Sequence, residues 1–154
     1  MKTETCCFTG HRNLSQKDIN EIKEHLKNEI VKLIHQGVIY FGAGGALGFD
    51  TICAMTILEL RKVYPQIKLI LVLPCSEQSI MWNISDKQKY EYIKSRADKV
   101  RILSPYYYDG CMLVRNRYLV DNSHYCICHI TKSTGGTAYT VAYAEKMGLK
   151  IIKI

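Results

Sequence analysis

The amino-acid sequence predicts a Rossmann-like α/β fold, a three-layer α/β/α sandwich with a mainly parallel central sheet of about six strands. Short apolar runs alternate with amphipathic segments along the whole chain, which is the pattern of repeated strand–helix units. The run 68–73 (KLILVL) is apolar on both faces, as expected of a parallel strand covered by helices on both sides. The 154 residues match one ordinary domain, so we expect a single domain over residues 1–154.

Each element of the first half of the chain has a local signal. The β-rich run 5–9 (TCCFT) stops at a glycine, and an amphipathic helix then extends from Ser15, a typical N-cap, to Gly37, a typical helix end. Residues 38–41 predict the second strand. The next helix is expected to end near Tyr64, because Pro65 prevents its continuation, and the third strand, 68–73, ends at Pro74.

The second half continues the alternation. Residues 86–97 predict a polar helix, 100–103 a short strand, 110–122 a helix, 125–130 a strand, 136–147 a helix and 150–154 the last strand. Right-handed crossovers between parallel strands then place helices on both faces of the sheet. The position of the strand 100–103 in the sheet order is left open by the sequence.

Composition narrows the class of protein. The longest apolar runs are much shorter than the roughly 20 residues of a membrane span, and no signal-peptide pattern is present, so we expect a cytoplasmic protein without a membrane partner. The seven cysteines are odd in number and form no CxxC pair, so neither a disulfide framework nor a metal site is predicted. The net charge of +7 is spread along the chain, which favours a solvated basic surface over a nucleic-acid interface.

A glycine-rich segment, GAGGALGFD (42–50), follows the second predicted strand and precedes a helix. Glycines let backbone N–H groups approach a phosphate, and the helix N-terminus behind them carries partial positive charge. We therefore predict ligand contacts at Gly44, Gly45, Gly48 and Asp50. The segment is neither a strict GxGxxG nor a Walker A motif, and a tight turn with Asp50 as a helix cap is the alternative.

A second loop of this kind, KSTGGTAYT (132–140), joins a strand to the helix that begins near residue 136. Its hydroxyls and glycine amides suit an anion, and the predicted ligand residues are Ser133, Gly135, Gly136 and Thr137. Ser, Thr and Gly also start ordinary helices, so one such loop is weak evidence, whereas two in one sheet strengthen each other.

The helical segment 112–123 (MLVRNRYLVDNS) places Asn116 within an apolar face, where a buried amide must find hydrogen-bond partners. Arg115 and Arg117 lie roughly 200° apart around this helix, so both cannot point into one pocket. Arg115 is the predicted ligand residue, and Arg117 is predicted to be a surface or structural charge.

The residues after the first strand border the crevice of a doubly wound sheet. Gly10 and Arg12 are predicted ligand residues, since an arginine clamps a phosphate with two hydrogen bonds. His11 is also included, either as a proton carrier or as a local hydrogen-bonding residue. Trp82, the only tryptophan, stacks on a base or covers the core, and the sequence does not choose between the two.

Five blocks, namely CCFTGHR, GAGGALGFDTICA, VLPC, VRNRYLVDNS and STGGTAYTVAYA, resemble in order and spacing the SLOG superfamily, in particular its YpsA-like family and the Rossmann domain of the DNA-processing protein DprA. The resemblance spans nearly the whole chain and implies a Rossmann-like fold that binds nucleotides or nucleotide-derived signals. Residue by residue, it implies ligand contacts at Gly10, Arg12, Gly44, Gly45, Gly48, Asp50, Arg115, Asn116, Gly135, Gly136 and Thr137.

The superfamily includes the LOG phosphoribohydrolases, whose GGxGTxxE motif carries an essential acid. Gly136 and Thr137 match the Gly-Thr pair here, but Thr140 occupies the place of the acid. A carboxylate stabilises the oxocarbenium-like state of N-glycosidic cleavage, so this departure weakens an enzymatic function unless Asp50, with Arg115, takes the role.

Three functions follow from these observations. The first is a sensor or signalling module for a small nucleotide-like ligand, such as a nucleotide or an ADP-ribose-like molecule, with no certain cofactor. The second is an N-glycosidic hydrolase acting on nucleoside monophosphates, with Asp50 and Arg115 as candidate catalytic residues. The third, with less support, is DprA-like binding of single-stranded nucleic acid. A homo-oligomer is compatible with the resemblance, although no segment of the sequence defines an interface.

Overall fold

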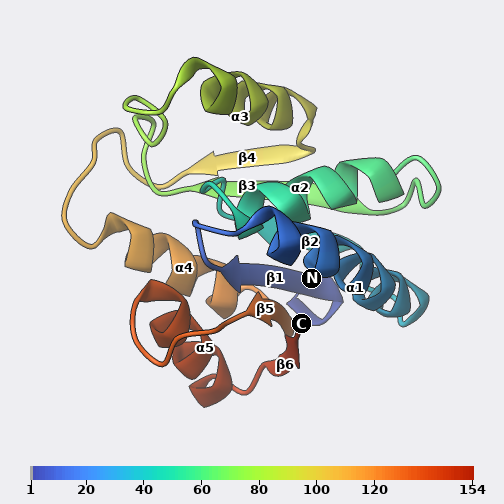
Figure 1. The fold of residues 1–154 in the computed structure, drawn as a ribbon. Coiled ribbons are helices and arrows are strands. Elements are labelled where there is room, and N and C mark those ends of the chain that lie inside the picture. The colour runs from blue at the N-terminus through green and yellow to red at the C-terminus, as the bar shows by residue number, and fades with distance from the viewer. Residues whose placement is uncertain (1) are drawn as a thin grey trace.

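A computed structural model of the chain describes residues 2–154 (Figure 1). Six strands alternate with five α-helices after a short 3-10 turn at Lys2–Glu4. The strands are β1 (Thr5–Gly10), β2 (Tyr40–Ala43), β3 (Lys68–Leu73), β4 (Lys99–Ile102), β5 (Tyr125–His129) and β6 (Lys150–Lys153). The helices are α1 (Gln16–His35), α2 (Phe49–Leu60), α3 (Ile84–Arg96), α4 (Cys111–Asp121) and α5 (Gly136–Lys146).

All neighbouring strands pair in parallel, in the order β4-β3-β2-β1-β5-β6. The Rossmann-like parallel sheet predicted from the sequence is therefore confirmed, and β4 lies at the edge beside β3. The chain winds outward from β1 to β4 and then returns to β5 on the other side of β1. The winding direction reverses between β1 and β5, so the crevice of this fold opens at their carboxyl ends.

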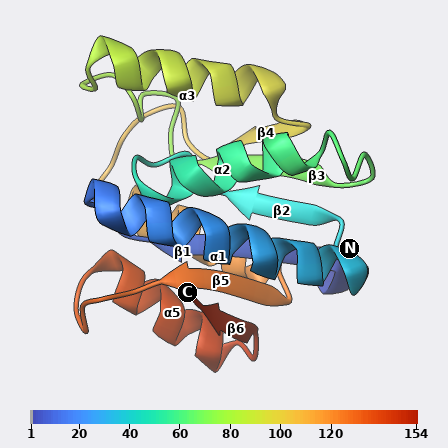
Figure 2. The same ribbon diagram turned by 45° about the vertical axis from the view of Figure 1, so that its right-hand side comes forward.

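Helices cover both faces of the sheet. One buried cluster joins α1, α2 and α3 to the face that carries Phe8, Phe41 and Leu69, and Figure 2 shows α1 and α2 in front of the strands. A second buried cluster joins α4 and α5 to the opposite face through Leu119 and Val141. The three layers follow from the apolar character of both sheet faces, because each face must be covered.

The predicted boundaries shift by a few residues where hydrogen bonds between segments decide them. The second strand begins at Tyr40 and not at Val38, because the Val38 amide donates to Leu33 O (3.0 Å) and so completes the end of α1. Helix α2 begins at Phe49, inside the glycine-rich segment 42–50. Its regular part ends at Leu60, and turns carry the chain to Pro65.

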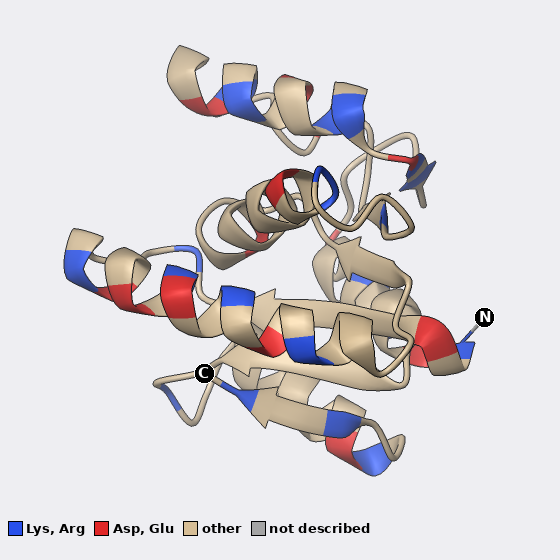
Figure 3. Ribbon diagram, turned by 90° about the vertical axis from the view of Figure 1, so that its right-hand side faces the viewer, with Lys and Arg blue, Asp and Glu red and all other residues tan. Residues whose placement is uncertain are grey.

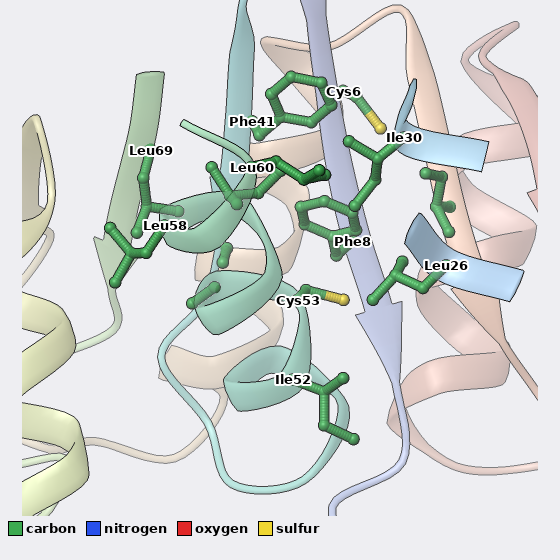
Figure 4. Close-up of a cluster of buried hydrophobic side chains, with 14 of the residues drawn as sticks. Cys6, Phe8, Leu26, Ile30, Phe41, Ile52, Cys53, Leu58, Leu60 and Leu69 are labelled. Carbon is green, nitrogen blue, oxygen red and sulfur yellow. The ribbon is translucent and has the colours of Figure 1, made fainter. Parts of the chain in front are cut away.

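All seven cysteines are free and buried. Figure 4 shows Cys6 and Cys53 among the apolar side chains between the sheet and its helices. Burial raises the pKa of both thiols, so they stay protonated and pack as small apolar groups.

Lysines and arginines alternate with acidic residues on the surface, as Figure 3 shows along α1. Within residues 2–154, no helix combines the length and the apolar character needed to cross a membrane.

Candidate functional site

A cavity of about 260 Å³ lies at the carboxyl ends of β1 and β5, where the winding of the sheet reverses. Its lining comes from the end of β1 and the loop after it, the turn before α2, the first turns of α2 and α5, and the first two turns of α4. The lining residues are Thr9, Gly10, His11, Arg12, Ala46, Asp50, Met112, Leu113, Arg115, Asn116, Gly136 and Thr137. Segments more than 100 residues apart in the chain thus meet around one hollow.

The cavity unites eight of the residues singled out from the sequence, namely Gly10, His11, Arg12, Asp50, Arg115, Asn116, Gly136 and Thr137. The other five, Gly44, Gly45, Gly48, Ser133 and Gly135, are not part of its lining. The structure thus brings the predicted loops together, but only some of their residues line the cavity.

The helix N-termini at this cavity lack side-chain caps. Helices α2, α4 and α5 begin after Gly48, Gly110 and Gly135, none of which contributes a side-chain hydrogen bond. By contrast, α1 and α3 are capped by the side chains of Ser15 and Asn83. The first amides of α2 and α4, those of Phe49 and Cys111, donate to His11 O and Tyr108 O (both 3.1 Å). The other N–H groups of a first helical turn have no partner within the helix, so these N-termini offer donors and partial positive charge to an anion.

Arg115 is the buried cation of the site, with 3% of its surface exposed. Its Nη1 donates to Gly44 O and, at 3.5 Å, to Val72 O, and its Nε donates to Asn116 Oδ1 at 2.8 Å. Burial lowers the pKa of this guanidinium and nearby Asp50 opposes the shift, but an arginine remains charged. As predicted, the two arginines do not point into one pocket: Arg115 lines the cavity, whereas Arg117 is exposed and lies over the Tyr139 ring.

A chain of hydrogen bonds links α4 to the start of α5. Asn116 accepts from Arg115 and donates from Nδ2 to Thr140 Oγ1 (3.1 Å), which in turn donates to Gly136 O (2.8 Å). Asn116, predicted to have a buried amide, is half-buried, and its amide has hydrogen-bond partners on both sides. Thr140, which stands where LOG proteins carry an acid, holds the first turn of α5 in place.

Asp50 and Arg12 add charges of opposite sign. Asp50 is buried, and its Oδ2 accepts from the Ala46 amide at 3.3 Å, so it also braces the turn before α2. Burial raises the pKa of Asp50, whereas Arg115, the Ala46 amide and Arg12 act in the opposite direction. Arg12 is exposed at the cavity and forms no ion pair within residues 2–154.

Two glycines of the 42–50 segment, Gly44 and Gly48, are required by close packing between loops. A Cβ on Gly44 would lie 2.5 Å from the Arg115 Nη1, so this glycine makes room for the buried guanidinium. A Cβ on Gly48, whose φ is +78°, would lie 2.2 Å from Arg12 O. These two glycines therefore support the cavity by letting the loops pack closely, whereas Gly136 has open space around it.

His11 ties the loop after β1 to the loop after β5. Its Nε2 accepts a hydrogen bond from the Thr131 amide (2.9 Å), so this nitrogen is unprotonated in the folded protein. Burial lowers the pKa of His11, and His129 and Lys132 lower it further. This geometry supports the local hydrogen-bonding role weighed for His11.

Acidification is expected to weaken this tie. A histidine with a lowered pKa contributes stability above its ordinary pKa of about 6.5, and that contribution is lost as the pH falls and the imidazole is protonated. We expect the free energy of unfolding to fall by roughly 0.5–1.5 kcal/mol, the value of one hydrogen bond, between about pH 7.5 and pH 5.5. Urea unfolding at both pH values measures this loss.

The matched variant is His11→Gln, whose amide oxygen accepts a hydrogen bond without titrating. The difference in pH dependence between the two proteins isolates His11 from other titrating groups. Equal pH dependence in both would contradict the role of the Thr131–His11 bond.

Two other hollows are present. A wide one of about 930 Å³, lined by residues of α1, α2 and α3, contains none of the predicted ligand residues. A small one of about 170 Å³ is lined by Trp82 and by Gly45, Gly48 and Asp50, so two predicted ligand glycines lie there and Asp50 lines both this hollow and the cavity. Trp82 packs edge-on against Tyr90, with ring centroids 5.1 Å apart, and against the core, which matches the core role weighed for it.

Sequence reasoning missed four lining residues, namely Thr9, Ala46, Met112 and Leu113. Each lies inside a block that the sequence had singled out. Ala46, Met112 and Leu113 have no side-chain group that marks a contact with an anion, and Thr9, which has a hydroxyl, falls within the predicted first strand. Thr140 was noted only as a replacement for an acid, and its bond to Asn116 requires the packing of α4 against α5.

The sequence is similar to a known protein family and to several of its bacterial members. The sequence profile of the YspA SLOG family matches residues 6–151. The chain is 29% identical over 135 residues to a UPF0398 protein of Halalkalibacterium halodurans, covering 86% of this chain and 71% of that protein. It is 25% identical over 133 residues to the UPF0398 protein YpsA of Bacillus subtilis, covering 84% and 74%.

Solved structures of DNA processing protein A share the fold. The Helicobacter pylori protein, described for its single-stranded DNA binding mode, has a TM-score of 0.64 and 20% identity, covering 97% of this chain and 64% of that one. The Streptococcus pneumoniae protein has a TM-score of 0.66 and 19% identity, covering 98% and 50%. The chain therefore spans about half to two thirds of these longer proteins.

Proposed function

The chain belongs to the YspA SLOG family, and we propose that it binds a nucleotide or nucleotide-derived ligand in the cavity at the carboxyl ends of β1 and β5. One observation carries this proposal: three helix N-termini without side-chain caps meet Arg12 and Arg115 around one hollow. Uncapped N–H groups and guanidinium groups together favour an anion of phosphate type.

The residues suggest how such a ligand lies. We place the phosphate at the first turn of α5, where Gly136 and Thr137 line the cavity and no Cβ at Gly136 hinders approach. Arg12 closes over it from the solvent side. Arg115 has Nε and Nη1 engaged within the protein, so we expect Nη2 to reach the ligand. The ribose lies toward Asp50, whose carboxylate accepts hydrogen bonds from hydroxyls.

Arg12→Ala is expected to lower the affinity for a nucleoside monophosphate about tenfold, because one charge-assisted hydrogen bond is lost. Arg12 is exposed and unpaired within residues 2–154, so the fold and its stability should not change. Isothermal titration of the two proteins with a panel of nucleoside monophosphates and ADP-ribose measures the effect.

Arg117→Ala is the matched control, since it removes the same charge from the outer side of α4. The proposal predicts unchanged affinity for this variant. Equal losses in both variants would point to a diffuse effect of net charge, and no binding of any member of the panel would refute the proposed function.

A second candidate, N-glycosidic hydrolysis of a nucleoside monophosphate, is favoured by one observation: a buried carboxylate, Asp50, lines the cavity. Incubation with nucleoside monophosphates and detection of free base tests it. Turnover that is lost in Asp50→Asn would show that the protein is an enzyme and that it needs the Asp50 charge. Asparagine can keep the hydrogen bond from the Ala46 amide, so this variant removes only the charge.

Single-stranded DNA binding is tested by the same titration with an oligonucleotide. A polyanion that contacts several phosphates loses affinity steeply with salt, so a steep salt dependence together with tighter binding than a mononucleotide would favour DNA.

A further inference from the structure

Three consecutive tyrosines, Tyr106, Tyr107 and Tyr108, are exposed in the loop between β4 and α4, with 72%, 62% and 45% of their surfaces accessible. Exposed aromatic side chains in a row are costly to leave in water and are typical of binding surfaces. None of the three contributes to the cavity described above or to the buried core.

The tyrosine loop leads directly into the wall of the cavity. Tyr108 O accepts a hydrogen bond from the Cys111 amide (3.1 Å) at the start of α4, and the next residues, Met112 and Leu113, line the cavity. Figure 1 shows this loop descending from the end of β4 to the start of α4. The tyrosines thus lie at the same edge of the sheet as the cavity.

Hydrogen bonds hold the beginning of this loop. Ser76 donates from its amide to Ser104 O (3.2 Å) and from its hydroxyl to Pro105 O (2.5 Å), which ties the loop to the segment after β3. The Ser104 hydroxyl donates to Tyr106 O (2.8 Å). Because these bonds fix the backbone at the start of the loop, stacking of a flat ligand group on the tyrosines requires less ordering of the chain there.

The size of the cavity points to a ligand that extends beyond it. Its volume of about 260 Å³ is below the roughly 300–1,000 Å³ of pockets that enclose whole drug-sized ligands. A phosphate and a ribose suit such a space, and a base attached to them then has to lie at the mouth.

The charges around the tyrosines favour a single base over a nucleic-acid strand as the bound group. The two segments next to the tyrosines, 74–83 and 104–110, contain Glu77 and Asp109 but no lysine or arginine. A strand of phosphates following the tyrosines would meet no cation there, whereas an uncharged base stacks on an aromatic ring without one.

We infer that Tyr106, Tyr107 and Tyr108 form a stacking platform for the base of the ligand whose phosphate and ribose occupy the cavity. This inference rests on the proposed function and specifies its ligand as a base-bearing nucleotide. The cavity recognises the anion, and the platform distinguishes a nucleotide from a simple sugar phosphate.

The test compares three probes, namely inorganic phosphate, ribose 5-phosphate and a purine nucleoside monophosphate, by isothermal titration. For the natural sequence, the nucleotide is expected to bind more tightly than ribose 5-phosphate. Replacing all three tyrosines by serine is expected to weaken nucleotide binding about 5- to 100-fold, as for the loss of a base–aromatic stack. Affinity for ribose 5-phosphate should stay the same, and the triple phenylalanine variant should restore nucleotide binding.

Tyr92→Ser is the control, because this tyrosine on α3 is exposed to a similar extent (46%) and lies outside the site. The inference is overturned if the base adds no affinity, if the serine variant binds the nucleotide as well as the natural sequence does, or if it loses both ligands equally. Unchanged nucleotide binding would assign the tyrosines to a protein partner. If ribose 5-phosphate and the nucleotide both fail to bind the natural sequence, the proposed function itself fails.

Discussion

Replacing Arg115 by methionine is expected to lower nucleotide affinity by roughly 10- to 100-fold and to destabilise the fold by about 3 kcal/mol. Both effects come from one guanidinium. It is the buried cation at the cavity, and it is also the donor to Gly44 O and Asn116 Oδ1. Methionine fills similar space, so the loss reports on charge and hydrogen bonds more than on packing.

Urea unfolding gives the stability of the variant, and titration at a temperature where it remains folded gives its affinity. Arg115→Lys separates the two contributions, because lysine keeps the charge but not the planar fork that binds several acceptors at once. Arg117→Met is the control for both measurements, since Arg117 is exposed. Nucleotide affinity that survives Arg115→Met would remove Arg115 from the proposed site and leave it a structural role.

Gly48→Ala is expected to lower the free energy of unfolding by about 3 kcal/mol. At φ +78° and ψ −121°, an alanine is strained whatever space surrounds it. In addition, its Cβ would lie 2.2 Å from Arg12 O, and the carbonyl of His11 is nearly as close at 2.6 Å. Backbone cannot move aside as a flexible side chain does, so the loops after β1 and β2 must separate.

Gly135→Ala is the matched comparison. Its backbone is also in a region that favours glycine, with φ +99° and ψ −175°, but a Cβ added there would meet no atom of another segment within 4 Å. The strain is therefore similar and the clash is absent, so the loss should be smaller, about 1 kcal/mol. Equal losses at the two positions would show that the loops after β1 and β2 do not pack as closely as the structure indicates.

Many features of this protein follow from the sequence because they depend on local interactions. The periodicity of apolar residues identifies each strand and helix, and the alternation predicts a parallel sheet, which the structure confirms. The 100° step of a helix separates Arg115 from Arg117, and the structure buries the first and exposes the second. Glycine and polar residues after strands mark the edge where the cavity lies.

The tertiary structure alone decided which residues of those loops line the cavity. Gly44 and Gly136 have the same signature in the sequence, yet the first accommodates the Arg115 side chain and the second faces open space. The distinction depends on a neighbour 71 positions away in the chain, as the Arg115–Gly44 hydrogen bond shows. The edge position of β4 and the bond from Asn116 to Thr140 likewise depend on contacts between segments distant in sequence. Local patterns report the conformation of a segment, whereas the role of a residue at a site depends on which distant atoms occupy the space beside it.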